Sequence, residues 1–125
     1  MLFPPSAIHL YLRFIHRVAQ LRLLIFEAVL KTPSKHWSLS QLAQEVGMSR
    51  TNFANQFKEL VGQSPINYLT EWRMSLAYSA LKQTKDTILS IALEFGYQSE
   101  ASFSRAFKRV MDRSPSEIRK VTETT

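Results

Sequence analysis

Residues 91–110 read IALEFGYQSEASFSRAFKRV, a short apolar helix, a glycine turn and a second helix. A related stretch upstream, at residues 42–60, reads LAQEVGMSRTNFANQFKEL. The two copies are 49 residues apart up to the glycine and 50 apart beyond it, so the second turn is one residue longer. A solenoid needs at least three stacked repeats. Two copies therefore predict two similar modules that are held apart by a spacer.

The remainder of the sequence also favours helices, because only 3 glycines occur and strict alternation is hard to find. Ser38 followed by Gln41 resembles a capping box that opens a helix. Pro65 suits the first position of a long helix. A first helical stretch, bent or split, is expected at 7–31, before a Thr-Pro-Ser loop. The later helices are expected at 39–46, 50–61, 65–83, 88–95 and 99–111, with a final turn or two from Ser114.

These elements predict an all-α fold, in which two helix-turn-helix subdomains are joined by a long connecting helix. Each subdomain is expected to be a homeodomain-like three-helix unit. The first covers about residues 39–61, the connecting helix about 65–83 and the second about 88–111. Gly47 and Gly96 are expected to adopt the positive φ of a tight helix exit. The buried stripe of the connecting helix is expected at Ile66, Leu69, Trp72 or Arg73, Leu76 and Ala80.

The second helix of each module separates its residues by angle, at about 100° per residue. The expected core faces are Phe53, Phe57 and Leu60, and Phe103, Phe107 and Val110. The opposite ridges are Thr51, Asn55 and Lys58 flanked by Ala54, and Ala101, Arg105 and Lys108 flanked by Ser104. Arginine and asparagine suit base edges in the major groove, and lysines suit phosphates. A solvated face is the alternative for one such helix, but its recurrence with turn and core intact favours DNA recognition.

Residues 91–109, followed by Ser114-Pro115-Ser116-Glu117-Ile118-Arg119, resemble the signature of the DNA-binding domain of the AraC/XylS family of bacterial transcription regulators. Copy one, from Leu42-Ala43 through Met48-Ser49 to Phe57-Lys58, is a second match. Arg73 also fits the family's connecting helix. The resemblance covers roughly residues 23–120, between an N-terminal helical extension at 1–22 and a polar tail at 121–125. Many members carry a sensing or dimerising domain before this one, so we expect either a stand-alone regulator or a truncated relative.

The resemblance implies seven helices, two of which enter successive major-groove segments of double-stranded DNA. Residues that would face bases are Arg50, Thr51, Ala54 and Asn55 in the first of these helices, and Glu100, Ala101, Ser104 and Arg105 in the second. Phosphate contacts are implied at Ser49, Lys58, Ser99, Lys108 and Arg109. The resemblance further implies control of transcription initiation, RNA polymerase as a second partner and action as a monomer or weak dimer on DNA.

Charge and composition support this hypothesis only in part. The formal net charge is +6, which favours anionic partners. However, residues 1–35 hold five basic residues and one acidic residue, whereas residues 36–125 hold 11 and 9. The absence of cysteine excludes disulfides and suits a cytoplasmic protein. No run reaches the roughly 18 apolar residues of a membrane span, and residues 1–6 lack the basic start of a signal peptide.

An enzyme is disfavoured. The only histidines are His9, His16 and His36, and no carboxylate lies at a helpful spacing from the first two. The sequence has no glycine-rich phosphate loop and no nucleophile elbow. We expect no cofactor and no metal. The competing function is a helical protein-interaction module that kept the fold and lost DNA binding.

The N-terminal stretch admits three interpretations. Its helical stripe is Leu10, Phe14, Val18, Leu21 and Ile25. The favoured interpretation is a long first helix that packs on the domain. The alternatives are an oligomerisation helix, or a basic amphipathic segment on a membrane surface, which we rank last.

Overall fold

The computed structural model describes the backbone of residues 5–124 and the side chains of residues 7–122. Residues 1–4 of the expected extension and residue 125 of the expected tail lie outside this range. The described backbone contains seven α-helices and no strand. They are α1 (Pro5–Lys31), α2 (Leu39–Glu45), α3 (Arg50–Val61), α4 (Pro65–Gln83), α5 (Ile88–Glu94), α6 (Glu100–Met111) and α7 (Pro115–Thr124). The all-α expectation is confirmed.

Hydroxyl side chains set where the helices begin. The capping box is present at α2, where the Ser38 hydroxyl accepts a hydrogen bond from the Gln41 backbone and the Gln41 side chain accepts one from Ser38. Such caps satisfy backbone N–H groups that have no partner inside the helix. The same role falls to Ser49, Ser64, Thr87 and Ser99 at α3, α4, α5 and α6.

Matching positions end the two modules' second helices. Gly62 ends α3 and Asp112 ends α6, both in the left-handed region. The two positions are 50 residues apart, like the paired serine caps. Gly47 and Gly96 have φ values of +66° and +89°, as expected. The repeat seen in the sequence is therefore repeated in backbone conformation.

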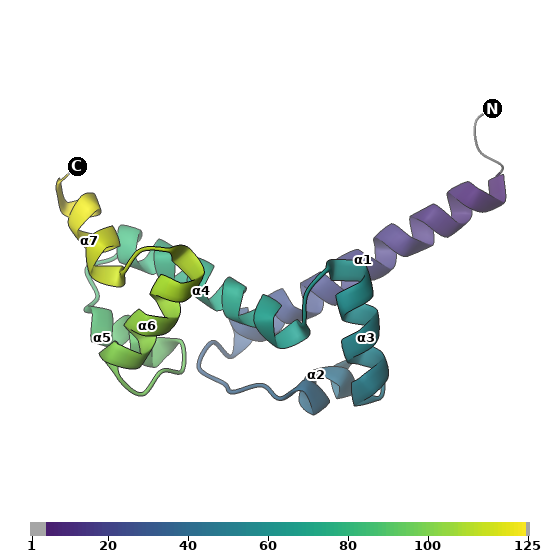
Figure 1. Ribbon diagram of the computed structural model, residues 1–125, viewed down its shortest axis with the longest axis horizontal. Coiled ribbons are helices and arrows are strands. Elements are labelled where there is room, and N and C mark those ends of the chain that lie inside the picture. Colours follow the sequence, from purple (N-terminus) through teal and green to yellow (C-terminus); the bar gives the residue numbers. More distant parts are fainter. Residues whose placement is uncertain (1–4, 125) are drawn as a thin grey trace.

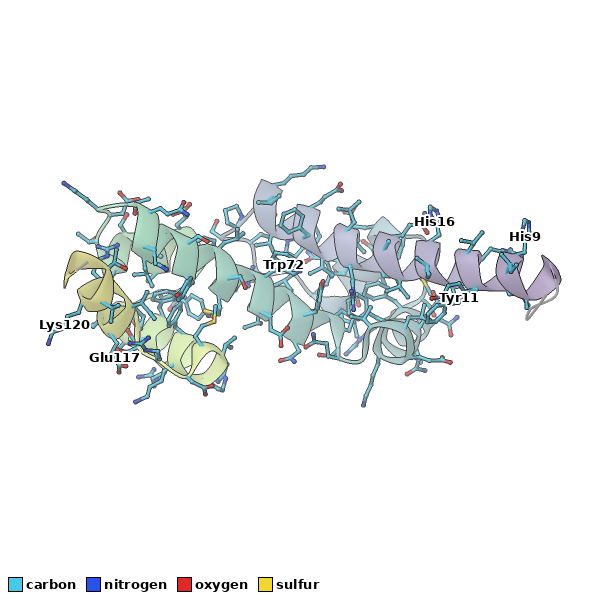
Figure 2. The ribbon with its side chains drawn as sticks, turned by 90° about the horizontal axis from the view of Figure 1, so that it is seen from above. His9, Tyr11, His16, Trp72, Glu117 and Lys120 are labelled. Atoms are coloured by element: carbon cyan, nitrogen blue, oxygen red, sulfur yellow. The ribbon has the colours of Figure 1, made fainter. Side chains whose placement is uncertain are left out.

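Helix α4 is the spine of the molecule, and the modules lie at its two ends (Figure 1). Its first half packs with α1 and α3, and its second half packs with α5, α6 and α7. Helices α3 and α6 lie on the same side of α4, in front in Figure 1 and below in Figure 2. The N-terminal part of α1 projects beyond the rest of the molecule (Figure 1).

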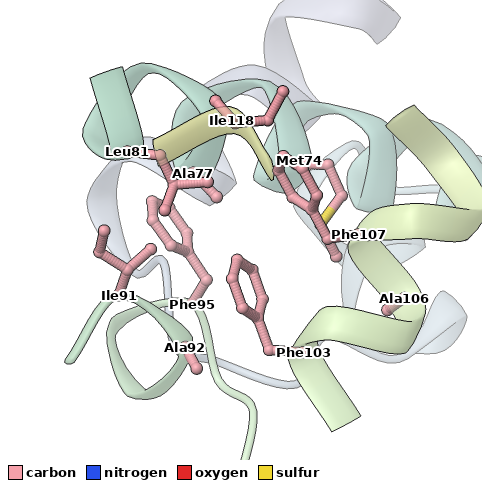
Figure 3. Close-up of a cluster of buried hydrophobic side chains, with 10 residues drawn as sticks. All are labelled: Met74, Ala77, Leu81, Ile91, Ala92, Phe95, Phe103, Ala106, Phe107 and Ile118. Carbon is pink, nitrogen blue, oxygen red and sulfur yellow. The ribbon is translucent and has the colours of Figure 1, made fainter. Parts of the chain in front are cut away.

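Each module has its own core. The first contains Phe53 and Phe57 of α3, and the second contains Phe103 and Phe107 of α6, all fully buried. Leu69 of α4 belongs to the first core. Met74, Ala77 and Leu81 of α4 belong to the second, where they face the aromatic side chains of Phe95, Phe103 and Phe107 (Figure 3). One helix thus completes both cores.

Three sequence expectations need correction. The expected stripe of α4 is buried at Leu69 and Arg73 and partly buried at Trp72, Leu76 and Ala80, but it was wrong at Ile66, which is exposed. It also missed buried residues of α4, which are Pro65, Met74, Ala77 and Leu81. The face rotates because α4 serves two cores in succession. Of the expected α1 stripe, only Leu21 and Ile25 are buried, and Leu10 and Phe14 are exposed. Helix α7 has 10 residues and exceeds the expected turn or two.

Replacing glycine by alanine tests how the second turn packs. A Cβ at Gly96 would lie 2.8 Å from the backbone oxygen of Ser34, whereas one at Gly62 would meet nothing within 4 Å. Both positions have positive φ, which costs about 1–2 kcal/mol for alanine, and the contact adds about 1–3 kcal/mol of strain. We expect Gly96→Ala to lower the free energy of unfolding more than Gly62→Ala, as measured by urea denaturation. Equal losses would contradict the contact.

Candidate nucleic-acid interface

The expected ridge of α3 is on the surface. Arg50, Thr51, Asn55 and Lys58 are exposed, and Ala54 is half-buried. The helix is held from behind by Phe53 and Phe57, whose ring centroids are 5.8 Å apart. The ridge is therefore fixed by the core and free on its outer side.

The ridge of α6 has the same organisation. Glu100, Ala101, Arg105, Lys108 and Arg109 are exposed, and Ser104 is half-buried. Phe103 and Phe107 hold the helix from behind, with centroids 5.6 Å apart. The small residues lie beside the long cations, which leaves room for close approach of a ligand backbone or base edge.

The cations of both ridges have no partner within the described chain. No hydrogen bond or salt bridge among residues 7–122 involves the side chains of Arg50, Lys58, Arg105 or Lys108. The one salt bridge in that range joins Arg113 to Glu117, away from the ridges. These charges are therefore available to an external anion.

The two serines expected at phosphates act as caps. The Ser49 hydroxyl accepts from the Asn52 N–H at 3.2 Å, and the Ser99 hydroxyl accepts from the Ser102 N–H at 3.0 Å. Each serine thus stands at the positive end of a helix macrodipole. The remaining backbone N–H groups of the first turn are the donors that an anion would meet there.

The two modules meet at a contact between the loop after α1, Arg73 and Gly96, which is called the seam here. This contact fixes the position of one ridge relative to the other. Arg73 of α4 is buried and donates a hydrogen bond from Nη2 to the backbone carbonyl of Lys35, in the loop between α1 and α2. Ser34 of the same loop packs against Gly96 in the turn of the second module. The first module's loop therefore touches both the spine and the second module's turn.

Burial shapes the electrostatics of this seam. It lowers the pKa of Arg73 from its ordinary value, and nearby Tyr97 acts in the opposite direction. Burial likewise raises the pKa of Tyr97, against the effect of the Arg73 and Arg109 cations. Since the ordinary pKa of arginine lies far above neutrality, Arg73 stays charged at pH 7. Its Nε is buried without a hydrogen-bond partner among the described residues.

Sequence reasoning missed one positioning residue. Arg17 of α1 donates from Nε to the Gln56 side chain of α3 at 3.0 Å, and its Nη2 lies 3.1 Å from the sulfur of Met48. Both targets flank the recognition ridge of the first module. Arg17 looked like an ordinary surface cation because its partners lie more than 30 residues away.

Other kinds of site find little support in the described chain. No group of three or more histidine, aspartate or glutamate side chains within it is placed to hold a metal ion. Between residues 5 and 124, every helix is too short or too polar to cross a bilayer.

Comparison with known proteins identifies the family. A family model described as a helix-turn-helix domain matches residues 42–121. An HTH-type transcriptional regulator of Haemophilus influenzae is 45% identical over 93 residues, which cover 74% of this chain and 31% of that protein. A putative AraC-like transcription regulator of Streptomyces lividans is 42% identical over 90 residues, covering 72% and 30%. The chain thus spans about a third of the length of these relatives.

A solved structure agrees with these relatives. The C-terminal domain of AraT, a response regulator from Geobacillus stearothermophilus, is similar with a TM-score of 0.73 and 30% identity, over 83% of this chain and 84% of that one. The chain belongs to the AraC/XylS family of helix-turn-helix transcription regulators. The family consists of regulators and not of enzymes.

Substitution of a cap tests how the second ridge is held. Ser99→Ala removes the acceptor for the first turn of α6, and we expect a loss of about 1 kcal/mol in the free energy of unfolding. Ser99→Asp keeps an acceptor and should retain most of that stability. Ser104→Ala is the control, because the Ser104 side chain makes no hydrogen bond in the described chain. Equal effects of the two alanine substitutions would refute the capping role.

Proposed function

We propose that the protein binds double-stranded DNA sequence-specifically and regulates transcription initiation. The observation that carries the proposal is the pair of exposed ridges, with unpartnered cations, on one side of a single spine. A helix-turn-helix protein places its second helix in the major groove. Two such helices on one side of α4 suit two groove segments about one helical turn, or about 10 base pairs, apart.

The ridges divide into two kinds of contact. Base reading is assigned to the residues nearest the N-terminal ends of the ridges, where the side chains are short or bidentate: Arg50, Thr51, Ala54 and Asn55 of α3, and Glu100, Ala101, Ser104 and Arg105 of α6. Arginine pairs with guanine and asparagine with adenine, while glutamate accepts from cytosine. Phosphate contacts are assigned to the helix N-termini at Ser49 and Ser99 and to Lys58, Lys108 and Arg109.

A protein of similar fold has been solved with DNA. The DNA-binding domain of AdpA, solved with a target DNA, matches 82% of this chain with a TM-score of 0.73 and 22% identity. At that identity the likeness concerns the fold alone. For control of initiation we further propose RNA polymerase as the second partner. The relatives named above are themselves transcription regulators, which supports the role in transcription.

Selection from random duplexes is the primary test. We expect enrichment of a site with two short conserved segments about 10 base pairs apart. Affinity for that site should fall steeply as salt rises, because phosphate contacts release counterions. A protein that enriches no sequence and binds duplex DNA without salt dependence would be an interaction module instead.

Arg105 and Lys108 provide a contrast on one helix. Arg105→Ala should cost about 1–3 kcal/mol of binding and relax the preference at one position, because it reads a base. Lys108→Ala should weaken all sequences alike and reduce the salt slope by about 1, because it contacts a phosphate. Fluorescence anisotropy titrations at several salt concentrations measure both effects.

Lys31→Ala is the matched control. Lys31 is an exposed cation in the last turn of α1, outside both ridges. Its removal should leave the base preference intact and change the salt slope less than Lys108→Ala. If all three variants bound alike, the assigned docking face would be wrong.

A further inference from the structure

Helix α1 carries a second apolar face that its own domain leaves uncovered. This face, named here the outer stripe, is spaced by three or four residues and occupies one narrow sector of the helix. Its members are Ile8, Leu12, Ile15, Ala19, Leu23, Phe26 and Leu30. The core of the first module instead takes Leu21, Ile25 and Val29, which lie on a different side of α1. Apart from Phe26, which packs on Trp72 of α4, the outer stripe is therefore not part of the packing already described.

The outer stripe is exposed along the whole helix. Its five large aliphatic side chains are between 45% and 57% exposed, and Phe26 is half-covered by Trp72 at a centroid distance of 4.5 Å. Together the five leave roughly 450 Å² of apolar surface, more than half of the about 800 Å² that one partner contributes to a standard interface. Apolar patches of this size on a monomer are often functional.

The spacing of the outer stripe is symmetric about Ala19. Ile15 and Leu23 lie four residues before and after Ala19. Leu12 and Phe26 lie seven residues away, and Ile8 and Leu30 lie eleven residues away. In an interface between two copies related by a two-fold axis, a residue i that contacts residue j of the second copy requires that residue j also contacts residue i of that copy. A spacing that is symmetric about a central residue satisfies this condition. The smallest side chain stands at the centre, where two crossing helices approach most closely.

We propose that α1 pairs antiparallel with α1 of a second copy of this chain through the outer stripe. In this register Ala19 meets Ala19 of the second copy, Ile15 meets Leu23, Leu12 meets Phe26 and Ile8 meets Leu30. The pairing covers a helix length of about 33 Å.

Charge agrees with the antiparallel register. Glu27 is the only acidic residue of α1. The register places it opposite position 11 of the second copy, within two residues of His9 and Arg13, and all three side chains lie on the same flank of the stripe. The Arg13 cation thus lies near the single carboxylate at both ends of the pair.

Association is tested first in solution without DNA. Sedimentation equilibrium on the full chain should give a mass that rises with concentration from one copy to two. Ile15→Glu and Leu23→Glu should each weaken the dimer about a hundredfold, because two carboxylates would be desolvated per dimer. Gln83→Glu adds the same charge at the exposed end of α4, outside α1, and should leave the dimer intact. Circular dichroism verifies that each variant folds, as expected for exposed positions.

The register is tested by cysteine substitution, since the chain has no cysteine of its own. On oxidation, Ala19→Cys should form a disulfide-linked dimer, and a mixture of Ile8→Cys and Leu30→Cys should form the mixed dimer. Ile8→Cys alone should stay unlinked, whereas a parallel pair would link it. A wild-type mass of one copy at all concentrations, or self-linking of Ile8→Cys, would overturn the proposal. Neither readout involves DNA, so the result is independent of the proposed function.

Discussion

The buried guanidinium of Arg73 is the interaction on which the arrangement of the modules depends. A charge taken out of water is costly unless it is paired or hydrogen-bonded. Arg73 meets this requirement at Nη2, which donates to the carbonyl of Lys35 and thereby holds the loop after α1 against the spine, while its Nε is buried without a partner among the described residues. The same loop then presents the Ser34 backbone to Gly96, which has no side chain to obstruct it. The hydrogen bond of Arg73 holds the loop of the first module against the spine, and the absence of a side chain at Gly96 lets this loop approach the turn of the second module.

Around this seam, α4 distributes its side chains between two cores. Leu69 completes one, Met74, Ala77 and Leu81 complete the other, and Leu76 packs partly against both. Two phenylalanines anchor α3 in one core and two anchor α6 in the other. The cores therefore fix the position of the ridge on the outer side of each helix. The positions of the ridges are therefore determined by buried residues that are not themselves part of the ridges.

The helices and their ends could be predicted from sequence because their signals are local. Serine caps, Pro65 and the three glycines act within one turn, and the boundaries of α3 and α4 follow them directly. The exposed ridges also followed from angle alone, since Phe53 and Phe103 identify the core side. The buried face of α4 could not be predicted, because it changes direction where the helix passes from one core to the next. The roles of Arg17 and Arg73 depend on partners 31 to 39 residues away, for which a single sequence holds no signal.

The length of α4 also determines the spacing and the relative rotation of the two modules. Because it is one uninterrupted helix between two cores, a single inserted residue would shift one module by about 1.5 Å and rotate it by about 100° relative to the other. The seam at Arg73 and Gly96 would break long before the two ridges faced opposite directions. Only changes near whole turns keep both ridges on one side, so the distance between the two ridges is set in steps of about 5.4 Å.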